Sequence, residues 1–449
     1  MQDSRDKNGL TRRRALKGAM LGTVAAPFVA KFALGQSSFD WKRFNGEKIE
    51  VLLAKGPRAD LLQKHQKEFE DLTGITVGAE QVPEQQQRQK QVIEFTSGAT
   101  TFDVTQTAWH VQKKLFGKTK WLSDLRPMLA DATLTAPDFD YADFSTAGVR
   151  FATQADGRVD SFPNNIDYHL VFWNQDLFEK KGIKFPDDYD GMLEAAKALH
   201  DPANGIYGYV GRGLKNANVP VWTNLLLGWD IDSIDPKTGQ INCNTDEAIA
   251  AAQMYKDISA KYGPAGLSGF NWMESQAAFM QGRVAMWMDG IGFSLPLEDK
   301  TKSRIAGRVG YGPMPKGPKV RHSGMFGDGM GVSAYTKKQG PAYYYIQWAA
   351  NKTNHGRILQ TGSGVPARNS AFSNPEVLAN LTAPKAFLDA AIYHGKIGRE
   401  SLPVVIPVTE FRDIYGIALT NMVNGGDPKT ELAKATEQYK PILEKSEKG

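Results

Sequence analysis

Short apolar runs alternate with longer amphipathic segments in the first quarter of the chain. Three runs, KIEVLLA, ITVGAEQV and TFDVTQT, have the length and composition of buried strands. Apolar residues recur at helical spacing after the first run, and a glutamine-rich segment follows the second. The pattern predicts strands at 48–54, 75–82 and 101–107 and helices at 59–72 and about 84–97. Strands and helices in alternation predict a parallel sheet with helices on both faces.

The same alternation recurs in the remainder of the chain. Apolar or alternating runs predict four more strands, at 169–174, 283–289, 308–315 and 329–335. Helical patterns with stop and cap signals predict helices at 188–199, 272–281, 340–350 and 428–439. No internal repeat is present. Two α/β lobes account for this number of elements.

The first 35 residues have the pattern of an export signal. Three arginines in TRRRALK precede an apolar stretch at 17–33 that is too short and too broken by Pro27 to span a membrane. The motif resembles the twin-arginine export consensus, and small residues in ALG (33–35) fit a cleavage site near Gly35. No cysteine follows that site, so we expect a free protein in the periplasm.

Charge and cysteine content exclude several classes of function. The formal net charge is +5, and residues 1–35 contain seven basic and two acidic residues, which is the whole excess. The rest of the chain is formally neutral and has no basic stripe, so nucleic acid is not an expected partner. Cys243 is the only cysteine, which excludes an intrachain disulfide and cysteine-held metal clusters.

Motifs for catalysis or cofactor binding are weak or absent. The segment GDGMG (327–331) lacks the third glycine of a dinucleotide loop and leads into a predicted strand. Phosphate-loop, zinc-protease and nucleophile-elbow motifs do not occur, and the seven histidines form no ligand-spaced pair. We expect no cofactor, no metal and no enzymatic activity, although paired carboxylates of a glycosidase would meet only in the fold.

Aromatic residues next to polar ones are frequent. The chain has nine tryptophans and fifteen tyrosines, and several occur in TAWH, NNIDYH, VWTN, LGWDID and MWMDG. Aromatic faces stack on sugar rings while carboxylates and amides bind hydroxyl groups. Taken singly, each tryptophan fits core packing equally well. Together they favour a small carbohydrate as ligand.

Five segments resemble, in order, the extracellular solute-binding proteins of ABC importers, in the sugar-binding family that includes maltose-binding protein. The segments are FEDLTGITV (69–77), SGATTFDV (97–104), the long stretch at 162–199, QAAFMQGRVAMWMDG (276–290) and GVPARNSAF (364–372). The resemblance covers about residues 46 to 440. It implies the periplasmic-binding-protein fold, in which two α/β lobes joined by a hinge close on a ligand in the cleft.

The resemblance also implies lobe boundaries and partners. The N-terminal lobe would comprise 46–160 plus 305–350, and the C-terminal lobe 161–304 plus 351–449. The partners would be a small carbohydrate (a mono- or disaccharide, polyol or glycoside) and the membrane subunits of an ABC permease, with the protein itself a monomer. An opine or polyamine ligand, or a periplasmic carbohydrate-active enzyme, stays open as an alternative.

Candidate ligand-binding residues follow from the family pattern, position by position. They lie in loops after the first and third strands, in the segment that crosses between the lobes, and near later aromatic or acidic motifs. The candidates are Lys55, Arg58, Gln106, Trp109, His110, Asn164, Asn165, Asp167, Trp222, Trp287, Asp289, Asp328 and Arg368.

Two departures from the family pattern bear on the ligand. Where a stacking tryptophan is usual, the chain has Gly290-Ile291-Gly292, and Trp287 or Phe293 would have to substitute for it. Lys55 and Arg58 replace an acidic pair found in some members. A maltodextrin ligand is therefore not expected. The two basic residues would suit an acidic or otherwise modified sugar, or they are solvated at the rim of the cleft.

Overall fold

The computed structural model describes residues 39–448. The predicted export signal at 1–35 thus lies outside the described residues. Within residues 39–448, no helix is both long enough and apolar enough to cross a membrane.

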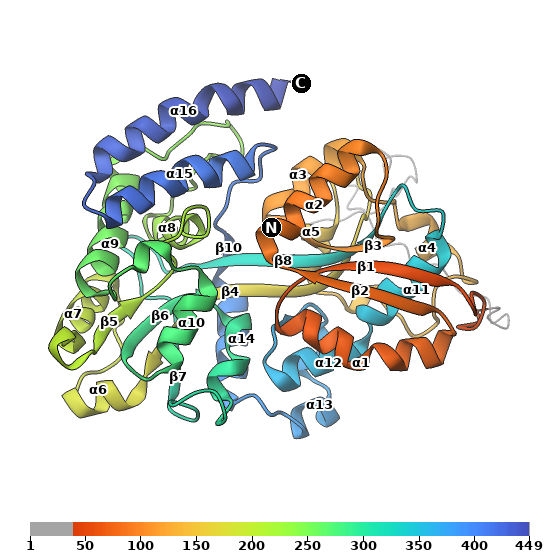
Figure 1. The fold of residues 1–449 in the computed structure, drawn as a ribbon, viewed down its shortest axis with the longest axis horizontal. Coiled ribbons are helices and arrows are strands. Elements are labelled where there is room, and N and C mark those ends of the chain that lie inside the picture. The colour runs from red at the N-terminus through yellow and green to blue at the C-terminus, as the bar shows by residue number, and fades with distance from the viewer. Residues whose placement is uncertain (1–38, 449) are drawn as a thin grey trace, which may run out of the picture. The chain divides into compact units, whose positions relative to one another are not determined.

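Ten strands form one curled sheet (Figure 1). The order along its main path is β2-β1-β3-β8-β4-β6-β5, with β10 beside β8 and with β7 and β9 beside β4. The strands are β1 (Lys48–Ala54), β2 (Thr76–Val82), β3 (Val104–Ala108), β4 (Phe162–Asn174), β5 (Tyr207–Val210), β6 (Val284–Gly290), β7 (Val309–Gly312), β8 (Ser323–Val332), β9 (Val365–Pro366) and β10 (Gly398–Glu400).

The long strand β4 joins two parts of the molecule. Its first half, from Phe162 to Tyr168, pairs with β8, and its second half, from His169 to Asn174, pairs with β6 and β7. We call the part built on β1, β2 and β3 the N-terminal lobe and the part built on β5, β6 and β7 the C-terminal lobe. The two-lobed periplasmic-binding-protein fold expected from the sequence is confirmed.

Helices cover both faces of the strands, as predicted. In the N-terminal lobe, α2, α3 and α5 lie on one face and α1, α11 and α12 on the other (Figure 1). The longer helices are α1 (Pro57–Thr73), α2 (Glu84–Ser97), α3 (Trp109–Thr119), α5 (Thr146–Ala152), α6 (Gln175–Lys181), α7 (Tyr189–Leu199), α8 (Val219–Leu226), α9 (Asp246–Tyr262), α10 (Trp272–Met280), α11 (Gln339–Ala349), α12 (Lys352–Thr361), α14 (Lys385–Ile397), α15 (Val408–Val423) and α16 (Pro428–Lys448). Residues 39–448 also contain two one-turn α-helices, α4 (Arg126–Ala130) and α13 (Pro375–Ala379).

The sheet differs from a purely parallel one. Strand β1 pairs in parallel with β2 and β3, and β5 pairs in parallel with β6. Strands β8 and β4 run antiparallel to each other, and each also pairs with an antiparallel neighbour, β3 and β6 respectively. The prediction of a parallel sheet is thus correct for β1, β2 and β3 and wrong for the strands that join the lobes.

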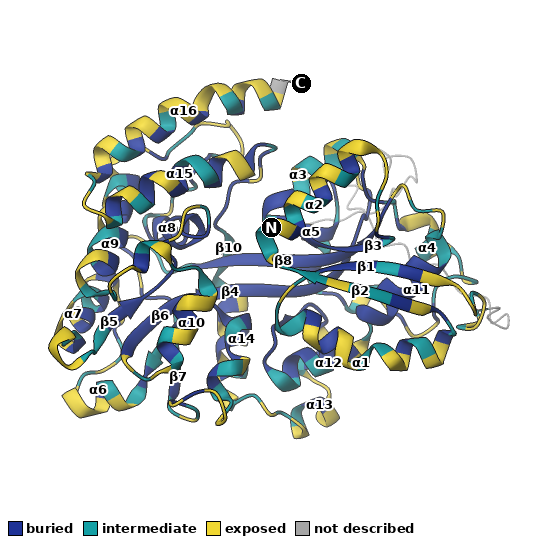
Figure 2. Ribbon diagram, in the orientation of Figure 1, coloured by how far each residue is buried: buried dark blue, intermediate teal, exposed yellow. Residues whose placement is uncertain are grey.

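Element boundaries differ from prediction where glycine or proline masks the pattern. Strand β8 begins at Ser323, six positions before its predicted start at 329, because SGMFGDGMGV contains four glycines and too few side chains to show a strand period. Helix α16 continues past the predicted end at 439 and includes Pro441. Strands β4 and β8, which the two lobes share, are deeply buried (Figure 2), and every residue of β8 is buried.

Candidate functional site

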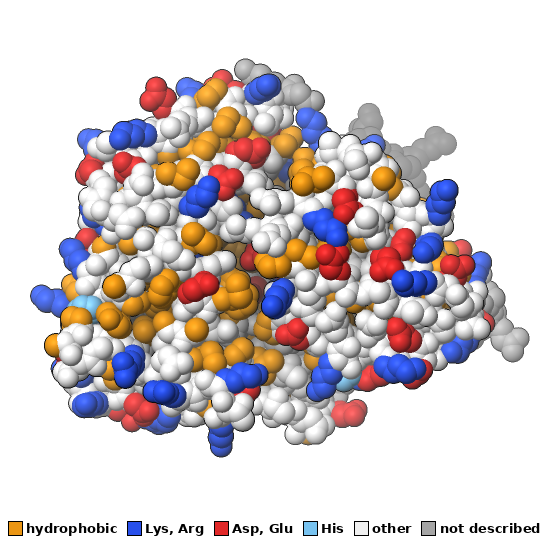
Figure 3. All heavy atoms as spheres, viewed as in Figure 1, with side chains coloured by type: hydrophobic (Ala, Val, Ile, Leu, Met, Phe, Trp, Pro, Cys, Tyr) orange, Lys and Arg blue, Asp and Glu red, His pale blue; other side chains and the backbone are white. Residues whose placement is uncertain are grey.

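A cavity of about 90 Å³ lies between the two lobes. One wall comes from the end of β1, the start of α1, helix α2 and strands β3 and β8. The other comes from the segment after β5 and from α10 and α15. Figure 3 shows the surface hollowed between the lobes, with hydrophobic side chains gathered beside the opening.

Six of the candidate residues line this cavity. They come from the ends of β1 and β3, the first turns of α1 and α3, and the shared strands β4 and β8. They are Lys55, Arg58, Gln106, His110, Asp167 and Asp328. Lys55 is exposed, whereas Gln106, Asp167 and Asp328 are buried.

Two carboxylates and one guanidinium form the polar end of the cavity nearest α1. Arg58 donates from Nη2 to Asp328 Oδ2 at 2.9 Å, and its Nε and Nη1 are buried without a partner among the described residues. Asp167 Oδ1 accepts hydrogen bonds from the backbone N–H groups of Tyr168 and Gly292, each at 3.0 Å. Burial raises the pKa of Asp167, and the nearby charge of Arg58 opposes that rise. Free acceptor and donor positions at this end are suited to hydroxyl groups.

The absence of side chains at Gly290 and Gly292 creates room for Asp167. A Cβ at Gly290 would lie 2.8 Å from Asp167 Oδ2, and one at Gly292 would lie 3.0 Å from Arg58 Nη1. The Gly-Ile-Gly sequence that departs from the family pattern is therefore the place where the C-terminal lobe approaches Asp167 and Arg58.

An aromatic pair forms the apolar wall. The ring centroids of Trp272 and Phe293 are 4.6 Å apart with an interplanar angle of 13°, and both residues line the cavity. Trp272 is the first residue of α10, where Asn271 forms a capping box with Glu274. Of the two substitutes considered for the missing tryptophan, Phe293 lies at the cavity, whereas Trp287 is fully buried against Phe172.

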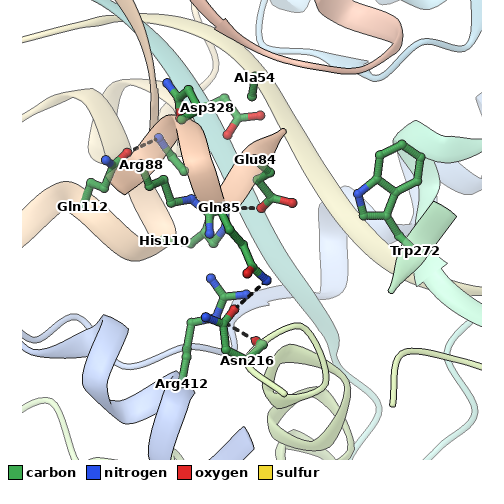
Figure 4. A network of polar contacts seen from close by, with 12 residues as sticks. Ala54, Glu84, Gln85, Arg88, His110, Gln112, Asn216, Trp272, Asp328 and Arg412 are labelled. Carbon is green, nitrogen blue, oxygen red and sulfur yellow. Dashed lines mark hydrogen bonds and ion pairs between the residues drawn. The ribbon is translucent and has the colours of Figure 1, made fainter. Parts of the chain in front are cut away.

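The end of the cavity between α2 and α15 is rich in arginine. Arg88 of α2, Arg212 after β5 and Arg412 of α15 all line it. Burial and the charges of the other two arginines lower the pKa of Arg88. Burial and Arg212 lower the pKa of Arg412 to about 10. Figure 4 shows Arg88 and Arg412 converging from opposite walls, with His110 beside Arg88.

Six further candidates lie outside the cavity lining. Trp109 stacks on Phe151 with Nε1 donating to Ser161 Oγ at 2.8 Å, and Trp222 stacks on Tyr415 in the core. Arg368 is fully buried and donates to the carbonyls of Phe139, Asp140 and Ala350. The side chains of Asn164 and Asn165 are buried on β4, and that of Trp287 is buried on β6.

The remaining candidate, Asp289, contacts a lining residue, and several residues that line the cavity were not predicted. Asp289 does not line the cavity, but its carboxylate accepts from Arg212 Nε at 2.9 Å and Nη2 at 2.5 Å. The lining residues that sequence reasoning missed are Glu84, Gln87, Arg88, His169, Arg212, Trp272, Phe326 and Arg412. Five of them lie in the first two turns of helices and Arg212 follows a strand, whereas His169 and Phe326 lie within strands. The eight residues therefore share no sequence signal.

No cluster of three or more His, Cys, Asp or Glu residues suited to a metal ion occurs among residues 39–448. Cys243 is buried, and its thiol donates to the carbonyl of Ser233 at 3.3 Å.

Comparison with known proteins gives one family and related structures. The family model of bacterial extracellular solute-binding proteins matches residues 55–355. An erythritol/L-threitol-binding protein of Mycolicibacterium smegmatis is 25% identical over 92% of this chain and 88% of its own. A probable amino-acid ABC transporter periplasmic-binding protein of Sinorhizobium fredii is 24% identical over 80% of this chain and 82% of its own.

A solved structure has the same fold. An ABC transporter solute-binding protein of Agrobacterium radiobacter K84, in complex with ribitol, superposes with a TM-score of 0.81 over 89% of this chain and 99% of its own, at 23% identity. The match of the family model to more than half of the sequence, and a cleft between two lobes, agree. The chain belongs to the bacterial extracellular solute-binding proteins, which capture solutes for ABC importers.

Proposed function

We propose that this protein captures a short polyol or similarly small carbohydrate in the interlobe cavity and delivers it to the permease of an ABC importer. The observation that carries the proposal is the polar end of the cavity, where Asp167, Arg58 and Asp328 offer acceptors and donors for hydroxyl groups. The relatives that bind erythritol, L-threitol and ribitol support this ligand class. The leader at 1–35 would place the mature protein in the periplasm.

The size of the cavity supports a short ligand. A cavity of about 90 Å³ suits a short polyol better than an oligosaccharide. The Trp272–Phe293 pair would pack against the carbon chain, while the carboxylates and Arg58 bind the hydroxyl groups. Selectivity would follow because a missing hydroxyl leaves a buried polar group without a partner.

Melting-temperature screening of the mature protein tests the ligand class. The panel contains four- to six-carbon polyols, sugar acids, disaccharides, opines and polyamines, because a ligand that binds the folded state raises the melting temperature. We expect shifts with polyols or their derivatives. A shift confined to opines or polyamines would contradict the proposal.

Substitution of Asp167 tests its role in binding. Asp167→Asn should weaken binding by about tenfold, or about 1.4 kcal/mol, because a hydroxyl would lose its charged acceptor. The same change should not lower the melting temperature of the free protein, since burial disfavours the ionised carboxylate and raises its pKa. Calorimetric titration measures the first effect and thermal unfolding the second.

A matched control is available on the surface. Asp156 is exposed and pairs with Arg158 at 2.8 Å away from the cavity, so Asp156→Asn should leave affinity unchanged. If Asp167→Asn behaves like this control, Asp167 does not contact the ligand.

A further inference from the structure

Three arginines from both lobes converge at one end of the cavity. We call Arg88, Arg212 and Arg412 the arginine cluster; Arg88 belongs to the N-terminal lobe and the other two to the C-terminal lobe. Arg88 pairs with Glu84, one turn before it on α2. Arg212 is held in a two-bond fork by Asp289. This fork leaves Nη1 of Arg212 without a hydrogen-bond partner among residues 39–448.

Arg412 has no ion pair within the part of the chain that the structure describes. The hydrogen bond that its guanidinium makes within residues 39–448 runs from Nε to the backbone carbonyl of Asn216 at 3.1 Å. Asp413, its chain neighbour, instead accepts from Asn216 Nδ2 at 2.8 Å. Arg412 is nevertheless only 4% exposed. Its two terminal nitrogens thus face the cavity end without a charged partner (Figure 4).

The cluster consequently has more positive than negative charge. Glu84 and Asp289 form ion pairs with Arg88 and Arg212, whereas Asp413 acts on Arg412 through its charge and forms no ion pair with it among residues 39–448. The side chain of Glu84 is 32% exposed and partly screened by solvent. Burial and mutual repulsion lower the pKa values of Arg88 and Arg412, which shows that the cluster is unfavourable without a counter-charge. The charge of Asp328 raises the pKa of Arg88, but Asp328 is already paired with Arg58.

The opposite end of the cavity has the reverse balance. There Asp167 and Asp328 face the guanidinium of Arg58, and Lys55, which also lines the cavity, is exposed, so solvent screens its charge. His110 and His169 add no positive charge, because burial lowers the pKa of each and lowers that of His169 to about 3. The cavity is therefore polarised, with surplus positive charge near α2 and α15 and surplus negative charge near α1 and β4.

We propose that the ligand is a short polyol with one anionic group, a carboxylate or a phosphate monoester, and that the arginine cluster binds this group. The planar forks of arginine match the geometry of both anions. The hydroxyl groups of the ligand reach Asp167 and Asp328, whose lone pairs they satisfy. Because the three arginines come from both lobes, the anion also neutralises a repulsion that opposes closure. This inference rests on the proposed capture of a polyol and refines its chemical class.

Matched ligands of one chain length provide the test. The mature protein is titrated by calorimetry with ribitol, D-ribonate and ribitol 5-phosphate at equal ionic strength. We expect one of the two anions to bind at least about tenfold more tightly than ribitol, and the comparison between them distinguishes carboxylate from phosphate. Ribitol binding as tightly as both anions would overturn the inference while leaving the proposed function intact. If none of the three binds and an opine or amino acid does, the proposed function itself fails.

Two variants separate anion binding from general binding. Arg412→Gln should lower the affinity for the preferred anion by about tenfold and should not lower the affinity for ribitol, because the change also removes part of the repulsion that opposes closure. Arg58→Gln, at the other end of the cavity, should weaken both ligands equally. Equal loss of both ligands in Arg412→Gln would contradict a specific role for the cluster.

Free-protein stability gives a readout that does not depend on the polyol chosen. Removal of an unpaired buried charge should leave the melting temperature of Arg412→Gln unchanged or higher than that of wild type. Sodium phosphate should raise the wild-type melting temperature relative to sodium chloride at equal ionic strength, and this difference should vanish in Arg412→Gln. A lower melting temperature in Arg412→Gln, with the phosphate effect retained, would show that Arg412 is only structural.

Discussion

A buried histidine shows how one residue connects parts of the chain distant in sequence. His355 Nδ1 accepts a hydrogen bond from the backbone N–H of Ala367 at 3.0 Å, and Nε2 lies 3.2 Å from the carbonyl of Pro163. Since the amide can only donate, the proton must sit on Nε2, and the ring is neutral. Burial and the nearby charge of Arg368 lower the pKa of His355 to about 3.

The lowered pKa predicts a pH dependence of stability. Between pH 3 and the ordinary value of 6.5, the unfolded chain binds a proton at this ring that the folded chain does not. Folding stability contributed by neutral His355 is therefore complete above about pH 6.5 and is lost as the pH falls below it. We expect wild type to lose about 1.4 kcal/mol per pH unit relative to His355→Gln.

Urea unfolding of both proteins between pH 7.5 and pH 5 measures this difference. Comparison with His355→Gln cancels the contributions of other titrating groups, including His169 and His394, whose pKa values are also lowered by burial. A stability difference that stays constant over the whole range would mean that His355 titrates normally in the folded protein.

At the scale of elements, strand β5 and helix α7 pack in close backbone contact. A Cβ on Gly208 of β5 would lie 2.0 Å from the carbonyl oxygen of Ala196 on α7. Backbone atoms cannot rotate away as a side chain can, so any side chain at this position must separate the two elements. Glycine at position 208 thus sets the distance between the sheet and this helix.

Gly208→Ala should lower the free energy of unfolding by about 2 kcal/mol or more. Gly269→Ala is the control, because nothing lies within 4 Å of a Cβ there and Gly269 is exposed. Chemical denaturation of the two variants measures both values. Equal stabilities would show that β5 and α7 can separate without loss.

The apolar pattern predicted local elements better than their pairing. The run at 48–54 became β1, and the run at 101–107 overlaps β3, which begins at Val104 and is buried although its central residues are polar. The start of β8 escaped prediction because close packing selects glycine there: a Cβ on Gly327 would lie 2.9 Å from a ring atom of Trp109. Antiparallel pairing of β8 with β3 and β4 depends on chain crossings that no local pattern records.

At the scale of the whole molecule, only half of the site was predictable. The family pattern selected Arg58 after β1, Gln106 in β3 and Asp167 in β4, and all three line the cavity. Arg88 and Arg412 gain their meaning only from the fold, which brings positions more than 300 residues apart to one cavity end. The aromatic motifs pointed to the wrong tryptophans. Trp222 and Trp287 are buried in the cores, whereas Trp272, which was not a candidate, lines the cavity.

A polar contact joins the two lobes beside the arginine end of the cavity. Gln85 of α2 donates to Asn216 Oδ1 at 3.1 Å (Figure 4). Gln85 does not line the cavity. Such partly exposed contacts contribute about 1 kcal/mol or less each, so closure stays reversible.

The contact from Gln85 should therefore act on affinity through the population of the closed form. Gln85→Ala should weaken ligand binding about two- to fivefold, because a protein that is closed for less of the time binds with a proportionally higher apparent Kd. Calorimetry measures that Kd, and small-angle scattering measures the radius of gyration with and without ligand. Gln63, whose amide donates to Ala79 O within the N-terminal lobe, is the matched control. Gln63→Ala should bind as wild type does; if Gln85→Ala also binds as wild type does, the contact between Gln85 and Asn216 contributes nothing to closure.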